Sequence, residues 1–495
     1  MAQYYGSFTG WQKYPHNLAF PALDVDASRC HESLSKDAAR LFIPDGELSR
    51  LQMLDLTSRD GHNVGPDQVI IESSEQLEIC LQRPSHTWVF QVAQAYSWGQ
   101  LPITEEMFRK LLTSMKVHPG FLDVVHVFGE KITTVEESFA AFFTRIFPGI
   151  SDPQSINYEI AYNIKYVTRH GRNFPLDPFS IRETGVYHKS LPDSGTSNWI
   201  LLSPSDALSE RLAKVFQEMQ TSDPLQQMRC HALIFLCLSE NWRDYVNYLE
   251  DNFSKLMDRG FFSNLRKPAR PGKIDADFGD IRSLQIMTDK LKKLIHLLNL
   301  NKALCNRLQL FFERVKLASS QNTTILFCQH ETMMENYLFQ NETHTSQLKS
   351  IVSRGEGVGS LIQHILDIRA TETSHNMNSA MHNISKQGAE ENKLVRQLTL
   401  KSTQDTRSMR VIALISAVFL PATFVATFFG SNFFGYEETK NGHSLTVASN
   451  IWIYVVTALT ISVVTVSLWY WWCSRYRSTM RLGETFGSEM DKSIV

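Results

Sequence analysis

Two long runs of residues without a charge, close to the C-terminal end, constrain the fold of this chain most strongly. Val411 to Phe429 form the first run, and Ile451 to Trp472 form the second. Each is long enough to cross the hydrocarbon core of a bilayer as a helix. Aromatic residues lie at both ends of the second run, as in the aromatic belts of membrane helices. We therefore expect two transmembrane helices rather than a buried helical hairpin of a soluble protein.

Basic residues around these runs predict their direction in the membrane. The loop between the runs, residues 430–450, holds one lysine and two glutamates, Glu437 and Glu438. Basic residues cluster before the first run and after the second: Lys393, Arg396, Lys401, Arg407 and Arg410, then Arg475, Arg477 and Arg481. Because short cytoplasmic flanks carry the excess of lysine and arginine, both termini should be cytoplasmic and the loop exoplasmic. The plasma membrane and the vacuolar membrane are the two expected locations.

Composition excludes several other classes of protein. The 495 residues are too many for one ordinary core, and a net charge of −2 without a basic stripe argues against nucleic acid as a partner. The first residues lack the pattern of a cleaved signal peptide. Seven cysteines lie far apart and none forms a C-x-x-C pair, so we expect reduced thiols. The N-terminal part contains no Walker loop, H-E-x-x-H or G-x-S-x-G, so neither an enzyme nor a cofactor is expected.

The first run carries its hydroxyl groups on one helical face. Pro421 cannot donate a backbone hydrogen bond, which leaves the carbonyl of Ala417 free. Steps of three or four residues select a polar face that consists of Met409, Ala413, Ser416, Leu420, Thr423 and Thr427. Such a face binds a partner helix or lines a pore, and the stripe alone leaves both interpretations open.

The outer end of the first run favours a pore. Gly430, Ser431 and Asn432 end the run with small neutral groups instead of a basic anchor. Mg²⁺ gives up its water reluctantly, and a ring of neutral oxygen acceptors can hold the hydrated ion without trapping it. Two spans cannot enclose a pore, so this interpretation predicts a homo-oligomer. Membrane lipid is the other expected partner.

The segment from Met409 to Asn432 resembles the first membrane helix of the CorA-like magnesium transporters. Pro421, Thr423 and Phe424 match the P-x-T-F of that family, and Gly430 and Asn432 match the first and third letters of its Gly-Met-Asn signature. Ser431 departs from the signature, where the family has methionine. The resemblance implies a CorA-like funnel built as a pentamer, in which a stalk helix leads into the pore helix and a ring of Asn432 binds the hydrated ion first.

The resemblance also implies roles for individual residues. Gly430, Ser431 and Asn432 would form the selectivity filter. The pore would be lined by Met409, Ser416, Leu420, Thr423 and Thr427. Glu437 and Glu438 would attract cations to the outer mouth, although an ordinary solvated loop explains them equally well. Asn432 would be the residue that holds the transported ion.

The remaining sequence predicts an α/β cytosolic domain followed by helices. We expect strands at residues 85–92, 158–168, 185–189 and 199–202, and a helix after Thr104 as its N-cap. Val117 to Asp123 resembles a conserved stretch of the same family. The expected domains are an extension 1–63, an α/β domain 64–222, a helical region 223–357 with a basic linker 264–280, a stalk 358–410, spans 411–429 and 451–472 around the loop 430–450, and a tail 473–495.

Two features of the stalk region leave more than one interpretation. Gly355 to Gly359 lacks the lysine and spacing of a phosphate loop and is predicted to be a hinge between helices. His375 and His382 lie seven residues apart on one face, where they are either exposed polar residues or metal ligands across subunits. The thin, partly polar seam of the stalk fits several copies around a wet axis, and it fits an ordinary cytosolic coiled coil too.

The sequence therefore supports two main hypotheses. The first is a channel-type divalent cation transporter, with Mg²⁺ as the expected ion and Zn²⁺ as an alternative because a zinc-transporting branch of the family shares the architecture. The second is a membrane-anchored oligomeric scaffold or sensor that no longer conducts, which the serine at position 431 favours. Substitution of Asn432 by leucine separates the two hypotheses.

Overall fold

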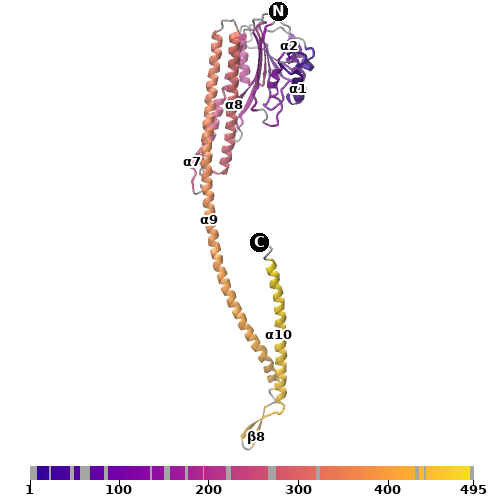
Figure 1. Ribbon diagram of the computed structural model, residues 1–495, viewed down its shortest axis with the longest axis vertical. Coiled ribbons are helices and arrows are strands. Elements are labelled where there is room, and N and C mark those ends of the chain that lie inside the picture. Colours follow the sequence, from indigo (N-terminus) through magenta and orange to yellow (C-terminus); the bar gives the residue numbers. More distant parts are fainter. Residues whose placement is uncertain are drawn as a thin grey trace. The chain divides into compact units, whose positions relative to one another are not determined.

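The structure is a computed structural model of the chain and is shown in Figure 1. It describes all residues except 1–7, 22–23, 45–48, 56–66, 83–86, 134–136, 150–155, 173–176, 193, 219–223, 266–274, 319–323, 430–433, 440–441 and 491–495. The described residues form two compact units, Met1–Thr371 and Glu372–Val495.

A seven-stranded sheet forms the centre of the first unit. Its strand order is β2-β1-β3-β7-β6-β5-β4, and every neighbouring pair is antiparallel except β3 and β7. The strands are β1 Leu51–Asp55, β2 Asp67–Ile71, β3 Thr87–Val92, β4 Phe142–Pro148, β5 Ile156–Arg169, β6 Phe179–Leu191 and β7 Thr196–Leu202. The four predicted strands are confirmed. The strand β6 is longer than expected because it pairs with β5 along the whole of its length.

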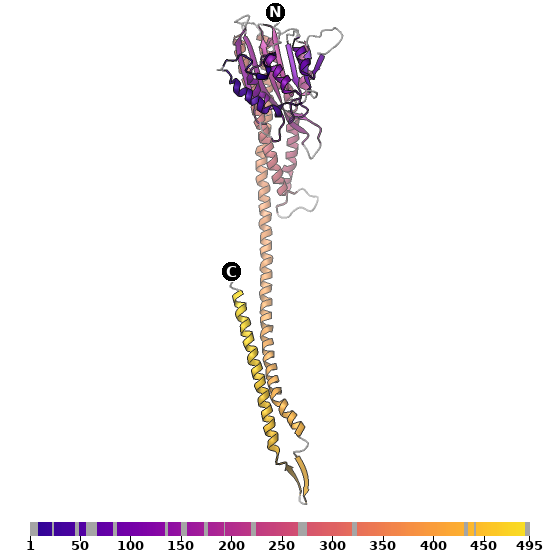
Figure 2. The ribbon, with the colours of Figure 1, turned by 90° about the vertical axis from the view of Figure 1, so that its right-hand side faces the viewer.

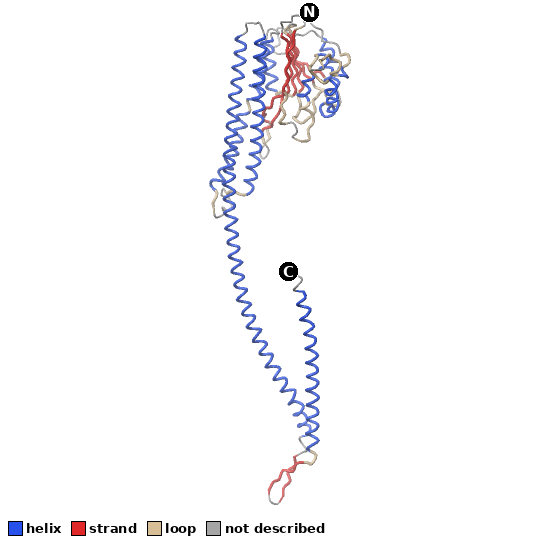
Figure 3. The backbone as a smooth tube through the Cα atoms, in the orientation of Figure 1, coloured by secondary structure: helices blue, strands red, loops and turns tan. Residues whose placement is uncertain are grey.

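Helices cover both faces of this sheet, as Figures 1 and 3 show. One face carries the short helices η1 Trp11–Lys13, α1 Ala27–Leu41, α2 Ser74–Gln82, α3 Glu105–Ser114, η3 Pro119–Phe121 and α4 Leu122–Val125. The other face carries α5 Asp206–Glu218, α6 Pro224–Ser239, α7 Trp242–Phe262, α8 Phe278–Ala318 and the start of α9 Thr324–Phe429. The predicted α/β fold class with a long helix is confirmed.

Strand β7 shows how the alternation of side chains separates two cores. Ile200 and Leu202 lie in the hydrophobic cluster under α1 to α4, whereas Trp199 and Leu201 lie in the cluster under α6 and α8. All four side chains are fully buried. Because both faces of the sheet are covered here, consecutive residues of β7 from Trp199 to Leu202 are all apolar and do not alternate with polar ones.

The N-terminal residues contribute to the first of these cores. Leu34 and Leu41 of α1 are fully buried, and β1 lies inside the sheet between β2 and β3. The expected boundary between an extension and the α/β domain, at residues 63 and 64, falls among the residues that the structure does not describe. It separates two strands that pair with each other.

The start of α3 agrees with its sequence pattern. The Thr104 hydroxyl accepts a hydrogen bond from the backbone N–H of Met107 at 3.3 Å, which confirms the predicted N-cap. Glu105 and Glu106 follow in the first turn, where a negative charge favours the positive end of the helix dipole.

The glycine-rich segment 355–359 is helical, so the prediction of a hinge is wrong. Helix α9 runs without a break through this segment for 106 residues. The glycines permit close packing instead. A Cβ atom at Gly359 would lie 3.2 Å from a methyl of Leu284 on α8, and one at Gly260 on α7 would lie 3.1 Å from Val358 on α9. Small residues at these crossings let three helices approach one another.

The second unit consists of the rest of α9, a β-hairpin and α10. The hairpin pairs β8 Phe434–Thr439 with β9 Gly442–Val447, and α10 extends over Ile451–Met490. The hairpin occupies most of the segment that is expected to be an exoplasmic loop. Figure 2 shows the hairpin beyond the ends of α9 and α10. Among the described residues, α9 and α10 each contain a stretch long and apolar enough to cross a membrane. The two predicted membrane helices thus have helical counterparts.

Candidate pore face and the comparisons

The residues predicted to line a pore lie together on one face of α9. Successive residues of a helix turn by about 100°, so steps of three, four and seven keep nearly the same direction. This face, which we call the pore face, consists of Met409, Ser416, Leu420, Thr423 and Thr427, and all five are exposed in the single chain. Met409 is 74% exposed and Leu420 67%. The chain itself therefore leaves this face uncovered.

A different face of α9 is covered. Val425 is only 4% exposed, and Ala417 and Pro421 are half-buried. Figures 1 and 2 both show the end of α9 beside the first part of α10. The half-buried residues among the described side chains of α10 repeat at helical spacing and mark its matching face: Ile451, Tyr454, Thr457, Ala458, Ser462, Thr465 and Trp469. The covered face of α9 and the pore face lie about 120° apart around the helix. Helix α10 thus leaves the pore face free for other partners.

The threonine hydroxyls of the pore face donate their protons to backbone carbonyls of α9 itself. Thr423 donates to the carbonyls of Phe419 and Leu420, each at 3.0 Å, and Thr427 donates to the carbonyl of Thr423 at 2.6 Å. A hydroxyl whose proton is used in this way offers only oxygen lone pairs to its surroundings. The face therefore presents hydrogen-bond acceptors without a charge, which suits the water shell of a cation.

The predicted filter and outer-mouth residues are described only in part. Gly430, Ser431 and Asn432 lie outside the described residues and follow directly on the last residue of α9. Glu437 and Glu438 are consecutive residues of β8, with Ser444 and His443 as register partners. Because consecutive strand residues belong to opposite faces, the two glutamates do not share one face of the hairpin.

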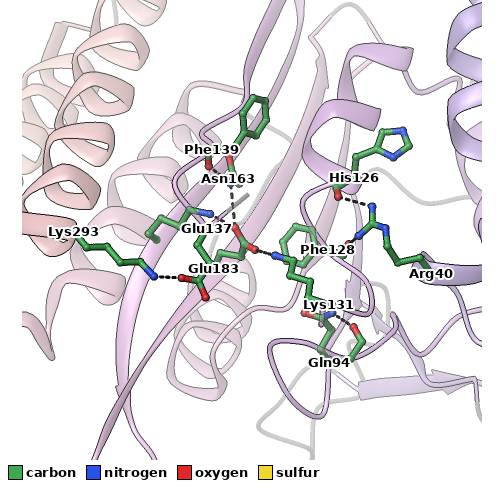
Figure 4. Close-up of polar contacts among 12 residues, drawn as sticks. Arg40, Gln94, His126, Phe128, Lys131, Glu137, Phe139, Asn163, Glu183 and Lys293 are labelled. Atoms are coloured by element: carbon green, nitrogen blue, oxygen red, sulfur yellow. Dashed lines mark hydrogen bonds and ion pairs between the residues drawn. The ribbon is translucent and has the colours of Figure 1, made fainter. Parts of the chain in front are cut away.

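The first unit buries a network of charged side chains, part of which Figure 4 shows. Glu183 forms ion pairs with Lys131, at 3.1 Å, and with Lys165, and it accepts a hydrogen bond from Asn163 at 3.3 Å. A third ion pair joins Glu137 to Lys293 of α8. Burial lowers the pKa of Lys165, and the neighbouring Glu183 carboxylate offsets part of that shift. The network ties the loop before β4, the sheet and α8 together.

A buried chain of hydrogen bonds crosses the other face of the sheet. The Tyr162 hydroxyl lies 2.9 Å from Nδ1 of His231, whose Nε2 lies 2.9 Å from Nδ1 of His188. Nε2 of His188 is 3.0 Å from the hydroxyl of Ser197. Burial lowers the pKa of His188 to about 3 and that of His231 well below its usual range, so both rings are neutral. Their role is to satisfy one another inside the core.

Ser33, His126 and Asp37 form a constellation similar to a catalytic triad. Nδ1 of His126 is 2.9 Å from the Asp37 carboxylate, and its Nε2 is 3.2 Å from the Ser33 hydroxyl. Asp37 also pairs with Arg40 at 3.0 Å, and this pairing lowers the pKa of the carboxyl against the effect of burial. Ser33 lies inside α1, where backbone N–H groups are used by the helix and cannot form an oxyanion hole. The constellation connects α1 to His126, the residue after α4. Figure 4 shows a further connection there, in which Arg40 of α1 donates to the backbone carbonyls of His126 and Phe128.

Metal ligands do not cluster in the described part of the chain. No group of three or more histidine, cysteine, aspartate or glutamate residues there could hold an ion. An open cleft of about 1240 Å³ is lined by Glu105 and Glu106 among others. These carboxylates pair with Arg109 at 2.7 Å and with Lys110 at 2.6 Å. The six cysteines whose side chains the structure describes form no disulfide bond, and His375 and His382 are exposed on α9.

Comparison with protein families gives two matches that together include most of the chain. The profile described as "CorA-like transporters" matches residues 6–260, just over half of the sequence. The profile described as "CorA-like Mg2+ transporter protein" matches residues 358–475. This chain belongs to the family of CorA-like transporters. The family consists of membrane-embedded divalent cation transporters rather than enzymes, as the sequence predicts.

Solved structures provide three similar chains. The CorA magnesium transporter from Methanocaldococcus jannaschii has a TM-score of 0.35 and 11% identity, with 84% of this chain and 96% of that chain covered. The full-length CmaX protein has a TM-score of 0.34 and 12% identity, with 88% and 99% covered. The ZntB cytoplasmic domain from Vibrio parahaemolyticus RIMD 2210633 has a TM-score of 0.26 and 7% identity, with 66% and 99% covered. No curated protein matches.

Sequence reasoning placed the candidate pore residues on one face of a helix, but it missed the charged network and the histidine chain. Glu183, Lys165 and Lys131 stand apart in the sequence and match no motif. His188 and His231 lie on a strand and a helix that meet only in the folded unit. A charged residue between apolar neighbours of a predicted strand, such as Lys165 between Ile164 and Tyr166, is a signal that points to a buried ion pair.

Proposed function

We propose that the protein is a channel-type divalent cation transporter with a preference for Mg²⁺. The observation that carries the proposal is the pore face of α9, which is exposed, uncharged and rich in acceptor oxygens, and which leads directly to Gly430, Ser431 and Asn432. Ions would pass down the membrane potential in hydrated form. Met409, Ser416, Leu420, Thr423 and Thr427 would line their path.

A pore of this kind needs several copies of the chain. One chain contributes one pore face, and α10 lies against a different face of the same helix, so two spans cannot surround an axis. We infer a homo-oligomer with α9 on the inside and α10 on the outside, next to lipid. Five copies follow from the family resemblance, as does a funnel formed by the cytosolic domains. Both termini would lie in the cytoplasm of a cell whose plasma or vacuolar membrane holds the protein.

The filter would be formed by rings of neutral oxygen groups. Asn432 would hold the hydrated ion at the outer entrance, and the carbonyl of Gly430 and the hydroxyl of Ser431 would follow. Neutral ligands exchange hydrogen bonds with the water shell and do not remove it, which is necessary because Mg²⁺ dehydrates reluctantly. Glu437 and Glu438 would raise the local concentration of cations at the mouth.

Ser431 supports a second candidate function. A serine in place of methionine alters the packing of the filter, and a chain that conserves the architecture but not the filter would act as a membrane-anchored oligomeric scaffold or sensor. The same substitution is also compatible with a preference for Zn²⁺, since hydroxyl and amide groups do not distinguish divalent ions by charge.

Flux of metal ions into liposomes that contain the purified full-length protein tests the proposal. Mg²⁺, Zn²⁺, Ni²⁺ and Co²⁺ are compared for the natural chain, for Asn432→Leu and for Asn450→Leu, a matched change in the exposed turn before α10. We expect Mg²⁺ flux that falls at least about tenfold in Asn432→Leu and stays unchanged in Asn450→Leu. A folded, oligomeric preparation that passes none of the four ions would contradict transport and support the scaffold.

A further inference from the structure

The β-hairpin between the two membrane helices has two faces of different composition. Directly opposite residues of an antiparallel pair belong to the same face, and successive residues of a strand belong to opposite faces. The register therefore places three pairs on the first face: Phe434 with Val447, Tyr436 with Leu445, and Glu438 with His443. The second face consists of small or polar residues: Gly435, Glu437, Thr439, Gly442, Ser444 and Thr446. We call the four apolar residues of the first face, at positions 434, 436, 445 and 447, the apolar hairpin face.

The hairpin needs a further surface to be stable. Strands β8 and β9 have six residues each and form a two-stranded sheet. An isolated two-stranded hairpin is only marginally stable in water, and each apolar cross-strand pair contributes about 0.2–1 kcal/mol. Val447, the one residue of the apolar hairpin face whose side chain the structure describes, is 50% exposed. The single chain thus leaves this part of the face uncovered.

Both ends of the hairpin are held close to the membrane helices. Strand β8 begins at Phe434, shortly after the last residue of α9 at Phe429, and β9 ends at Val447, shortly before α10 begins at Ile451. Figures 1 and 3 show the hairpin next to the ends of the two helices. Trp452, at the start of α10, is 62% exposed and is a residue type that concentrates at membrane interfaces. The first pair of the hairpin therefore lies near the bilayer surface.

The order of the pairs along the hairpin matches the depth of the headgroup region. This region is about 5–8 Å thick on each side, since a bilayer of about 40–45 Å contains about 30 Å of hydrocarbon. A strand rises about 3.4 Å per residue, so the second apolar pair lies about 7 Å beyond the first, and the pair of Glu438 and His443 about 14 Å beyond it. The charged residues of the loop, Glu437, Glu438 and Lys440, all belong to this far end. Even an upright hairpin would keep its apolar pairs among the headgroups and its charges in water.

We propose that the apolar hairpin face docks on the headgroup region of the bilayer beside the membrane helices, while the opposite face stays in water. Two glutamates against one lysine give the loop a negative charge, so neutral zwitterionic lipid suits it better than anionic lipid. Glu437 would then be the glutamate that stays accessible to cations, whereas Glu438 belongs to the docked face. The inference requires that α9 and α10 cross the membrane, and it does not depend on whether the protein conducts ions.

Spin labels on two consecutive residues test the docking. Leu445→Cys and Ser444→Cys belong to opposite faces of β9, and each is labelled with a nitroxide in the full-length protein in phosphatidylcholine liposomes. The unsubstituted chain gives the background from native thiols. Power saturation compares access of oxygen, which concentrates in lipid, with access of a water-soluble nickel chelate. We expect the ratio of oxygen to nickel access to be at least about threefold higher at position 445 than at 444.

Two results would overturn the proposal. Equal ratios at the two positions would show that neither face prefers lipid. Low access of both reagents to position 445 would show that a protein surface, such as a second copy of the chain, covers the apolar hairpin face in place of lipid.

Hydrogen exchange tests the same contact without a label. Amide exchange of residues 434–447 is measured in the same liposomes for Leu445→Ser and for Ser444→Ala. Loss of the apolar side chain removes part of the docked surface, so we expect exchange to become at least about fivefold faster in Leu445→Ser and to stay unchanged in Ser444→Ala. Unchanged exchange in Leu445→Ser would contradict a hairpin that depends on its apolar face.

Discussion

The interior of the α/β unit and the α9–α10 segment of the second unit satisfy their polar groups in opposite ways. In the first unit, Glu183 and His188 are buried and find partners on distant strands and helices of the same chain. In the second, no described residue between Ile451 and Trp472 is buried, and the hydroxyls of Thr423 and Thr427 bond only to their own helix. One chain completes the first region, whereas it leaves most of the described side chains of the second region exposed.

This difference explains where substitutions should act. A change in the α/β unit removes a partner that the same chain supplies, so it should alter folding stability. A change on the exposed faces of α9 leaves the single chain nearly as stable as before, so it should alter assembly or flux. The following predictions test that division, from the largest expected effect to the smallest.

Loss of the central carboxylate should destabilise the α/β unit most. Glu183→Leu leaves Lys131 and Lys165 buried without their partner, and a buried charge that loses its counter-ion costs about 3–5 kcal/mol. Hydrogen exchange of β5 and β6 in the full-length protein measures the change. The exposed Glu390→Leu on α9 should alter that exchange by less than about 0.5 kcal/mol. Similar losses of stability in Glu183→Leu and in Glu390→Leu would show that the two regions do not differ in how they depend on their charged side chains.

Substitution of glycine by alanine should change the free energy of unfolding in opposite directions in the two regions. A Cβ atom at Gly185 in β6 would lie 2.8 Å from Val124 and 2.9 Å from Phe128, so Gly185→Ala should cost about 1–3 kcal/mol through overpacking. No atom lies within 4 Å of a Cβ at Gly388, and Gly388→Ala should stabilise α9 by about 0.5–1 kcal/mol. Thermal unfolding and hydrogen exchange measure both changes in stability. Destabilisation by Gly388→Ala would contradict the view that this position of α9 is open.

Acid should weaken the α/β unit through its buried histidines. Burial lowers the pKa of His330 to about 4 from a usual value of 6.5. Between these values the unfolded chain binds a proton that the folded chain does not, so stability falls as the pH falls, by up to about 1.4 kcal/mol per pH unit. Above pH 7 the ring is neutral in both states and the effect vanishes.

A pair of histidine variants isolates this contribution. The natural chain should lose stability when the pH falls from 6.5 to 5.5, and His330→Leu should make that loss smaller by about 1 kcal/mol. Hydrogen exchange of α8 and α9 measures the loss. His375→Leu, at an exposed position of the stalk, should leave the loss unchanged. An identical slope in the natural chain and in His330→Leu would contradict a buried neutral ring.

The same contrast explains how far the sequence alone could be interpreted. The two apolar stretches and the N-cap at Thr104 follow from local patterns of charge, period and capping, because each of these patterns lies within a single helix. The shared face of Met409 and Thr427 follows from helical period alone, and its role as a pore stays a proposal. The hinge at Gly355 to Gly359 was mispredicted because glycine usually interrupts a helix, while here it permits contact with Leu284 and other side chains distant in sequence. Ion pairs such as Glu183 with Lys165 depend on strand register, which no local pattern specifies.

The contribution of the first residues to the sheet shows the same limit. Strand β1 pairs with β2 and β3, and its five residues carry no signal strong enough to place them in a seven-stranded sheet. For the filter, local pattern identified Gly430 and Asn432 through the family signature, and their roles stay a proposal. Local pattern is thus most informative where the chain is least buried.

Chemical labelling of α9 during transport tests the central claim most directly. Single cysteines are introduced at Ser416 and Thr423 on the pore face and at Phe419 and Phe424 on other faces, and Mg²⁺ flux is followed while a charged methanethiosulfonate reagent is added to the liposomes. The unsubstituted chain provides the background from native thiols. We predict block of flux at positions 416 and 423 and none at positions 419 and 424. Block at 419 and 424 alone, or at none of the four positions in a conducting protein, would contradict the assignment of the pore to this face of α9.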